Sequence, residues 1–148
     1  MSTSSRFAVA VHILTLLEMS EGEPVTSEYV AGSVNTHPAV VRRLLGMLAK
    51  AGITTSQLGA GGGALLAKAA ADVTLLDVFR AVEEGDVFAM HHGRPSPACP
   101  VGRQIQGVLE VTTDAAQRAL EEQLAARTVA DILADVRVRE SAECSSAA

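Results

Sequence analysis

The chain has 148 residues, 48% of them apolar, which excludes both a wholly disordered chain and two full domains. Alanine supplies 25 of these residues and aromatic side chains only 3%, so the apolar mass consists mainly of small, helix-favouring residues. The net charge of −5, taken as a total, argues against a nucleic-acid partner, but the charges are distributed unevenly along the chain.

The first predicted helix extends to about Met19 from Ser4 or Ser5, either of which can cap it. Its apolar side chains recur at a spacing close to that of a helix turn, and they are Phe7, Val11, Leu14 and Leu17. His12 lies near this apolar face, and we expect it to be packed and not catalytic.

The second predicted helix is short and extends from its N-cap Thr26 to about Ser33, with Tyr29 and Val30 turned inward. A helix of this length is not stable alone, so it must pack against its neighbours. Residues 34–36 predict a tight turn, because asparagine and threonine side chains hydrogen-bond the nearby backbone and asparagine tolerates a positive φ.

The third predicted helix extends from His37-Pro38 to about Ala51, and Gly52 ends it. Its buried stripe follows helical spacing and consists of Val41, Leu44, Leu45 and Leu48. Small and basic side chains lie on the opposite face, and they are Thr36, Ala39, Arg43, Met47 and Lys50, with Arg42 at the margin. A helix that enters a DNA groove presents such a face.

A two-stranded hairpin is predicted next, from residues 53–58 and 64–67, with a glycine-rich tip at 59–63. A nucleotide-binding loop is the competing interpretation of these glycines. It does not fit, because no Gly-Lys-Ser/Thr follows them and they do not open a helix.

The C-terminal half begins with a fourth predicted helix, for which Thr74 and Asp77 form a capping box. A polar loop covers residues 86–98, and a long helix extends from about Pro100 to about Ala126. The apolar stripe of this long helix has no partner helix of similar length elsewhere in the chain.

The end of the chain is predicted to hold one more helix, which begins at Thr128 with Asp131 as the second member of its capping box. We expect a disordered tail over residues 139–148.

The charge divides into three segments. Residues 1–28 carry −3, residues 29–71 carry +4 with no acidic residue, and residues 72–148 carry −6. An acid-free segment inside an acidic chain is typical of a site for an anionic partner. The alternative is that this segment is merely apolar and rich in glycine.

Three helices followed by a hairpin predict a mainly α protein with a winged helix-turn-helix, a two-stranded wing and a long C-terminal dimerisation helix. The long helix is expected to pair antiparallel with a second copy, so two third helices would face half-sites about 34 Å apart. We expect a DNA-binding domain over residues 1–84, and a sensor-like loop with dimerisation helices over 85–138.

Six short motifs carry more information together than any one of them does alone. They are Ser5-Arg6-Phe7-Ala8-Val9-Ala10-Val11-His12, Ala31-Gly32-Ser33-Val34-Asn35-Thr36, Val41-Arg42-Arg43-Leu44-Leu45, Lys50-Ala51-Gly52, Gly61-Gly62-Gly63 and Leu75-Leu76-Asp77-Val78. Together they resemble the Rrf-two family of bacterial transcription regulators over residues 5 to about 137. The resemblance implies a homodimeric repressor that binds double-stranded DNA.

The resemblance also bears on cofactors and on the wing. Iron–sulfur and nitric-oxide sensors of this family hold a cluster with three cysteines before the long helix, whereas here only Cys99 lies there and Cys144 is in the tail. The chain is therefore similar to the cluster-free branch, and no cofactor is expected. The family's wing commonly has a basic residue before its glycines and an aromatic after them, where this chain has Leu58 and Ala64, so we expect weak positioning by the wing.

The expected DNA contacts follow from charge and position. Contacts to phosphates are assigned to Arg6, Thr26 and Lys68, and contacts toward base edges to His37, Ala39, Arg42 and Arg43. Further contacts from the same face and from the wing are assigned to Thr36, Lys50, Gln57, Gly61, Gly62 and Gly63. The simpler alternatives are that Thr26 only caps its helix, His37 only begins one, and Arg42 is a solvated flank.

Cys99 is the candidate sensor residue, because a helix N-terminus favours the reactive thiolate, and the effector is unknown. The alternatives are a buried inert thiol and a metal site of Cys99 with His91 and His92. No catalytic motif is present, so an enzyme is not expected. The alternative function is a protein-interaction module, derived from such a regulator, that no longer binds DNA.

The expected location is the cytoplasm. The longest strongly apolar stretch, residues 7–17, is shorter than the roughly 20 residues of a membrane span. The features of a signal peptide are also absent, so we expect no membrane partner.

Overall fold

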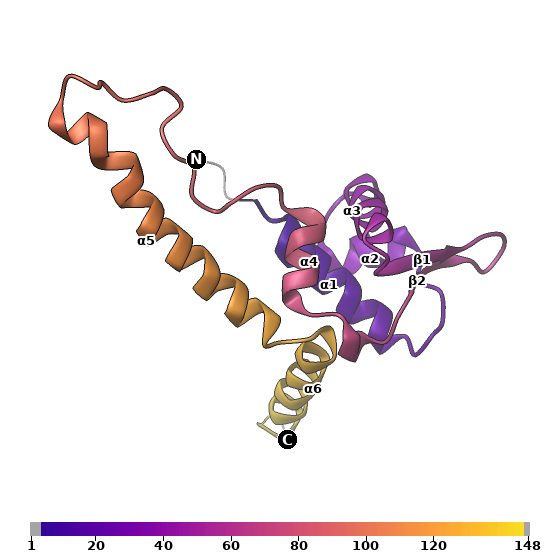
Figure 1. Ribbon diagram of the computed structural model, residues 1–148. Coiled ribbons are helices and arrows are strands. Elements are labelled where there is room, and N and C mark those ends of the chain that lie inside the picture. Colours follow the sequence, from indigo (N-terminus) through magenta and orange to yellow (C-terminus); the bar gives the residue numbers. More distant parts are fainter. Residues whose placement is uncertain (1–3, 147–148) are drawn as a thin grey trace. The chain divides into compact units, whose positions relative to one another are not determined.

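The computed structural model describes residues 4–146. In chain order (Figure 1) the elements are α1 (Arg6–Met19), α2 (Ser27–Val34), α3 (Pro38–Lys50), β1 (Thr54–Gln57), β2 (Gly63–Leu66), the 3-10 helix η1 (Ala70–Asp72), α4 (Leu75–Val82), α5 (Pro100–Ala125) and α6 (Val129–Ser146). The chain divides into two compact units, and the second of them is the segment Glu84–Leu124. The first unit contains the residues before and after that segment.

Local signals set the ends of the first helices. Thr26 caps α2 by accepting a hydrogen bond from the backbone N–H of Tyr29 (3.2 Å). Asn35 ends α2 in the left-handed region, with φ of 59°. His37 then caps α3, because its Nδ1 accepts from the N–H of Ala39 (3.1 Å).

The core of the first unit is formed by aliphatic side chains from α1 to α4 and from the start of α6. Its largest fully buried members include Ile13, Leu14, Val30, Val41, Leu44, Leu48, Val78 and Val129. This burial fixes α3 against α1 and α4 through one apolar stripe, and the other face of α3 remains exposed.

The two strands form an antiparallel hairpin in which Thr54 pairs with Leu66 and Gln57 with Gly63. Val25 and Ala64 exchange two backbone hydrogen bonds (3.0 and 2.8 Å), which fix the hairpin to the residues before α2. Glycine is required at Gly63, because a Cβ there would lie 2.6 Å from the carbonyl oxygen of Val25. The hairpin is therefore attached to the helix-turn-helix and projects beside α3 (Figure 1).

Two capping boxes lie next to each other. Thr74 and Asp77 bond each other's backbone N–H at the start of α4, and Thr128 and Asp131 do the same before α6. A backbone hydrogen bond from the N–H of Leu75 to the carbonyl of Arg127 (2.8 Å) joins the two helix starts. The start of α6 is thereby part of the first unit.

The second unit consists of a loop and most of α5. The loop is held to the helix by a hydrogen bond from the N–H of Val87 to Oε1 of Gln117 (3.2 Å). No residue of α5 is buried in the described part of the chain, and Val101 and Val108 are 66% and 63% exposed. None of the described helices has the length and apolar character that a membrane crossing requires.

The elements confirm the predicted mainly α fold with a two-stranded wing, but one expectation each for α1, α2 and the end of α6 was wrong. Tyr29 is 60% exposed, because Val30 and Ala31 fill the narrow inner face of α2. His12 is exposed and hydrogen-bonds Ser33 (2.9 Å), since it is turned one residue away from the apolar stripe of α1.

The third wrong expectation is the tail over 139–148. Helix α6 continues to Ser146, since arginine, glutamate and alanine residues beyond Val136 favour a helix. The hydroxyls of Ser141 and Ser145 also donate to carbonyls one turn earlier. Residues 147 and 148 lie outside the described residues.

Candidate nucleic-acid interface

The outer face of α3 is basic and small. Exposed side chains on this face and at its N-terminal end are His37, Ala39, Val40, Arg42, Arg43 and Lys50. Thr36 is half-buried, and Met47, which was expected on this face, is half-buried and packs against the core. The basic side chains are thus presented together from one helix, as binding in a major groove requires.

Arg42 lies in an ion pair that joins α3 to the first turn of α2. Its Nη1 donates to Oε1 of Glu28 at 3.0 Å, and both side chains are more than half exposed. Among residues 4–146 no ion pair involves Arg43. The two neighbouring arginines therefore differ, since Arg43 is free to meet a base edge and Arg42 must first leave Glu28.

A groove of about 340 Å³ lies between α3, the residues before α2, and the hairpin. Arg42 and Gly46 line it from α3, and Ser56, Gln57 and Gly63 line it from the strands. The basic face of α3 therefore continues directly onto the hairpin. Thr26 lies nearby with an exposed hydroxyl, which can donate to a phosphate while it caps α2.

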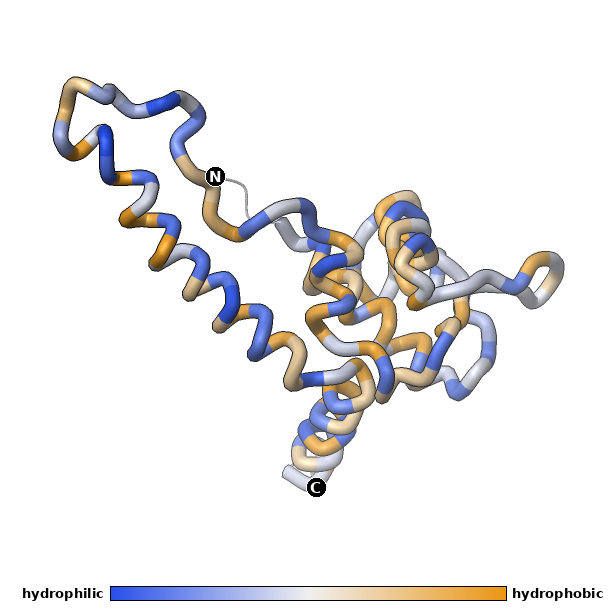
Figure 2. The backbone as a smooth tube through the Cα atoms, viewed as in Figure 1, coloured by the Kyte–Doolittle hydropathy of each residue, from blue (hydrophilic) through white to orange (hydrophobic). Residues whose placement is uncertain are grey.

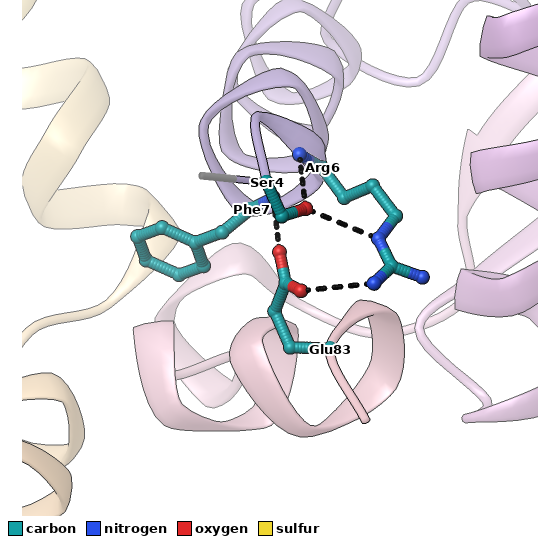
Figure 3. Close-up of polar contacts among 4 residues, drawn as sticks. All are labelled: Ser4, Arg6, Phe7 and Glu83. Carbon is teal, nitrogen blue, oxygen red and sulfur yellow. Dashed lines mark hydrogen bonds and ion pairs between the residues drawn. The ribbon is translucent and has the colours of Figure 1, made fainter. Parts of the chain in front are cut away.

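Arg6, the predicted phosphate contact of α1, is half-buried and engaged by contacts within the protein (Figure 3). Its Nη2 donates to Oε2 of Glu83 at 3.2 Å, and its Nε donates to Oγ of Ser4 at 3.1 Å. The same Glu83 carboxylate accepts from the N–H of Phe7 (3.3 Å). Arg6 thus joins the start of α1 to the end of α4, and its contact with DNA stays a prediction.

The hairpin and the segment just after β2 carry the remaining predicted contacts. Gln57 and Lys68 are exposed, and so is Gly61, whose φ is +75°. Leu58 lies between Gln57 and the glycines, and its side chain is 90% exposed. The hairpin therefore offers hydrogen-bonding groups and one large apolar side chain to whatever lies beside α3.

The predicted sensor residue lies in the second unit. Cys99 is exposed, so the alternative of a buried thiol was wrong, and its carbonyl accepts from the N–H of Arg103 (3.0 Å) at the start of α5. Over residues 4–146, His91, His92 and Cys99 do not come together as a metal-binding group. The sensor role of Cys99 stays a prediction.

Sequence patterns missed Glu28 and Glu83. Their arginine partners are 14 and 77 residues away, so no helical spacing connects them. The distribution of charge along the sequence does distinguish Glu28, because it is the last acidic residue before residues 29–71, which contain no acid.

This geometry agrees with the comparison to known proteins. The family model Rrf2 (Rrf-two), described as "Iron-dependent Transcriptional regulator", matches residues 3–135. The chain belongs to the Rrf2 family. A Bacillus subtilis (strain 168) protein named as the HTH-type transcriptional regulator YwnA is 46% identical over 130 residues, which cover 88% of this chain and 96% of YwnA.

Solved structures agree with this assignment. A crystal structure described as that of a DNA binding protein has a TM-score of 0.70 at 45% identity, and the match covers 87% of this chain and 99% of that one. IscR of T. potens has a TM-score of 0.69 at 25% identity, with 92% and 88% covered. This Rrf2 protein is therefore a DNA-binding transcriptional regulator.

The family description raises the question of iron. This chain has two cysteines, Cys99 in the loop before α5 and Cys144 in α6, and both are exposed. The described residues contain no group of three or more His, Cys, Asp or Glu side chains that could hold a metal ion. The donor set of this chain does not fit an iron ion or an iron–sulfur cluster.

Proposed function

We propose that this Rrf2 protein is a cytoplasmic, homodimeric repressor of transcription that binds a pseudo-palindromic operator. The observation that carries the proposal is the exposed basic face of α3 beside the hairpin, within a segment of charge +4 that has no acid. In this arrangement α3 enters the major groove, where Arg42 and Arg43 are within the reach of base edges. Repression follows when the operator overlaps a promoter.

The remaining contacts serve to position the protein. Thr26, Lys50 and Lys68 are exposed around α3 and donate to phosphates, while the acidic remainder of the chain limits binding to other DNA. Dimerisation is assigned to α5, since Val101 and Val108 are exposed along it. Two copies then place two α3 helices on successive half-sites.

The test is a binding titration of the full chain with a duplex selected from a random pool and with a scrambled duplex, at several salt concentrations. Arg43→Ala should weaken specific binding by about 5- to 150-fold, because a bidentate arginine–guanine contact is lost. Arg94→Ala, an exposed arginine in the loop of the second unit, is the matched control and should not change binding. Equal affinity of the wild type for both duplexes would contradict the proposal and favour the interaction module.

The signal is assigned to Cys99, because its thiol is exposed at the start of α5. The same titration is repeated after treatment with an oxidant. Cys99→Ser should abolish any oxidant-dependent loss of operator binding, whereas Cys144→Ser should keep it. If operator binding by Cys99→Ser is as sensitive to the oxidant as that of the wild type, Cys99 is not the sensor residue.

A further inference from the structure

The tip of the hairpin displays a leucine to solvent. Leu58 follows β1 and is 90% exposed, more than any other large apolar side chain in the described part of the chain. In Figure 2 the end of the hairpin has hydrophobic colours, and the strand next to it is pale or hydrophilic. The Leu58 side chain is not packed in the hydrophobic core, so stabilisation of the fold does not account for an apolar residue at this position.

The turn beyond Leu58 has a fixed conformation. Gly59 and Gly61 have φ of +91° and +75°, and the N–H of Gly62 donates to the carbonyl of Gly59 (3.0 Å). A Cβ on Gly62 would lie 2.2 Å from the carbonyl oxygen of Gln57. In this conformation the turn presents Leu58 outward.

The hairpin also lacks charge. No Asp, Glu, Lys or Arg lies between Lys50 and Lys68. The hairpin cannot neutralise a phosphate, so its contact with DNA must come from backbone N–H groups, the hydroxyl and amide side chains of β1, and Leu58.

The position of the hairpin limits what Leu58 can touch. The Val25–Ala64 pairing fixes β2 to the residues before α2, and Arg42 and Gln57 line the same groove. With α3 in the major groove, a hairpin on the same surface faces the DNA that flanks the α3 site, and an uncharged tip there fits the floor of a groove better than the phosphates.

We propose that Leu58 enters the minor groove that flanks the α3 site and selects A·T pairs there by apolar contact. This inference rests on the proposed function, since it requires α3 in the major groove. An apolar side chain can lie against the floor of an A·T minor groove, whereas a G·C pair places the amino group of guanine there. Apolar side chains of other minor-groove proteins act as wedges between base steps, so Leu58 also favours flanks that deform easily.

The experiment uses one selected core site with three kinds of flank: A·T, G·C and inosine·C. Inosine lacks the minor-groove amino group of guanine but keeps the guanine pattern in the major groove. The wild type should bind the A·T and inosine·C flanks equally well, and at least about fivefold more tightly than the G·C flank. Leu58→Ala should lose this preference with an unchanged salt dependence, because no charge is involved.

Two further variants complete the test. Leu58→Arg should bind all flanks more tightly, with a salt slope steeper by about one. As the control, Val138→Ala shortens another apolar side chain, which is 69% exposed in α6, and it should behave as the wild type. If Leu58→Ala keeps the flank preference, or if inosine·C behaves as G·C, the inference about Leu58 is wrong while the proposed function stands. If the wild type prefers no core site, both are wrong.

Discussion

Glu28 forms an ion pair with the basic face of α3, and its position affects how that face meets DNA. It immediately precedes the acid-free segment 29–71 and pairs with Arg42 at 3.0 Å. Because the two side chains are 57% and 67% exposed, solvent screens the pair, and its free energy is about 1 kcal/mol or less. Arg42 can therefore leave Glu28 for a contact with DNA, but only where the DNA contact has a more favourable free energy than the ion pair.

Glu28→Gln should therefore reduce specificity. The change frees Arg42 and removes a repelling charge, so affinity for random DNA should rise by about two- to fivefold, the equivalent of an exposed ion pair. The salt slope for random DNA should steepen by about one, the value for one added phosphate contact. Competition between operator and random duplexes measures both quantities. Glu143→Gln, in α6, is the charge-matched control, and equal ratios in the two variants would contradict the role of Glu28.

At the scale of elements, the helix starts depend on short-range hydrogen bonds. In the capping box of α6, the N–H of Thr128 donates to Asp131 (2.9 Å), and the N–H of Asp131 donates to Oγ1 of Thr128 (3.2 Å). The hydrogen bond from the backbone of Thr128 is the main cause that holds the pKa of Asp131 below its ordinary value. The ionised carboxylate is thus the form that stabilises the start of α6.

Asp131→Asn should lower the melting temperature at pH 7 and have little effect in acid. The pKa of Asp131 is lower in the folded state, so its stabilisation is present above the unfolded value of about 3.9 and is lost as pH falls through the folded value. Thermal unfolding from pH 7 to pH 3, followed by circular dichroism, measures the difference from the wild type. Asp114→Asn, an exposed aspartate in α5, is the control. The difference should shrink once the pH falls below about 3.9. A difference of the same size at pH 7 and at pH 3 would mean that another property of Asp131 matters.

The sequence predicted these elements well because their signals are local. Thr74 and Asp77 are three residues apart, as are Thr128 and Asp131, and the stripe of α3 follows one helical period. Contacts between distant residues carry no such signal, so the pairs Arg6–Glu83 and Arg42–Glu28 were not predicted.

Exposure at the margins of a helix is also difficult to predict. Tyr29 and His12 lie one residue away from buried neighbours, where a rotation of about 100° decides whether a side chain is inside. The basic face of the site was found from sequence because charge and period coincide on α3. The outward display of Leu58 was not, since it depends on the shape of a glycine turn.

At the scale of the whole molecule, α5 has two different faces. The loop of its own unit covers one face, through the hydrogen bond from Val87 to Gln117. Val108 is nine residues before Gln117, which at about 100° per residue places it on the opposite side of the helix. Val101 and Ala115 lie seven residues before and after Val108, so the uncovered side is a stripe of small apolar residues. A helix of 26 residues, about 39 Å long, that shows such a stripe fits the dimerisation role proposed for α5.

Val108→Asp should therefore separate the proposed dimer into monomers. In an antiparallel pairing of two α5 helices the stripe of each copy meets the same stripe of the other, so one substitution places two carboxylates in a single apolar seam. Sedimentation equilibrium should then give the 15.3 kDa mass of one chain in place of twice that mass. Helical content should be unchanged, because Val108 is 63% exposed within the single chain. Val138→Asp introduces the same charge at a valine of similar exposure in α6 and should remain dimeric. Operator affinity should fall with the dimer, since one copy reaches only one half-site, and a Val108→Asp protein that stays dimeric would exclude this face of α5 from the interface.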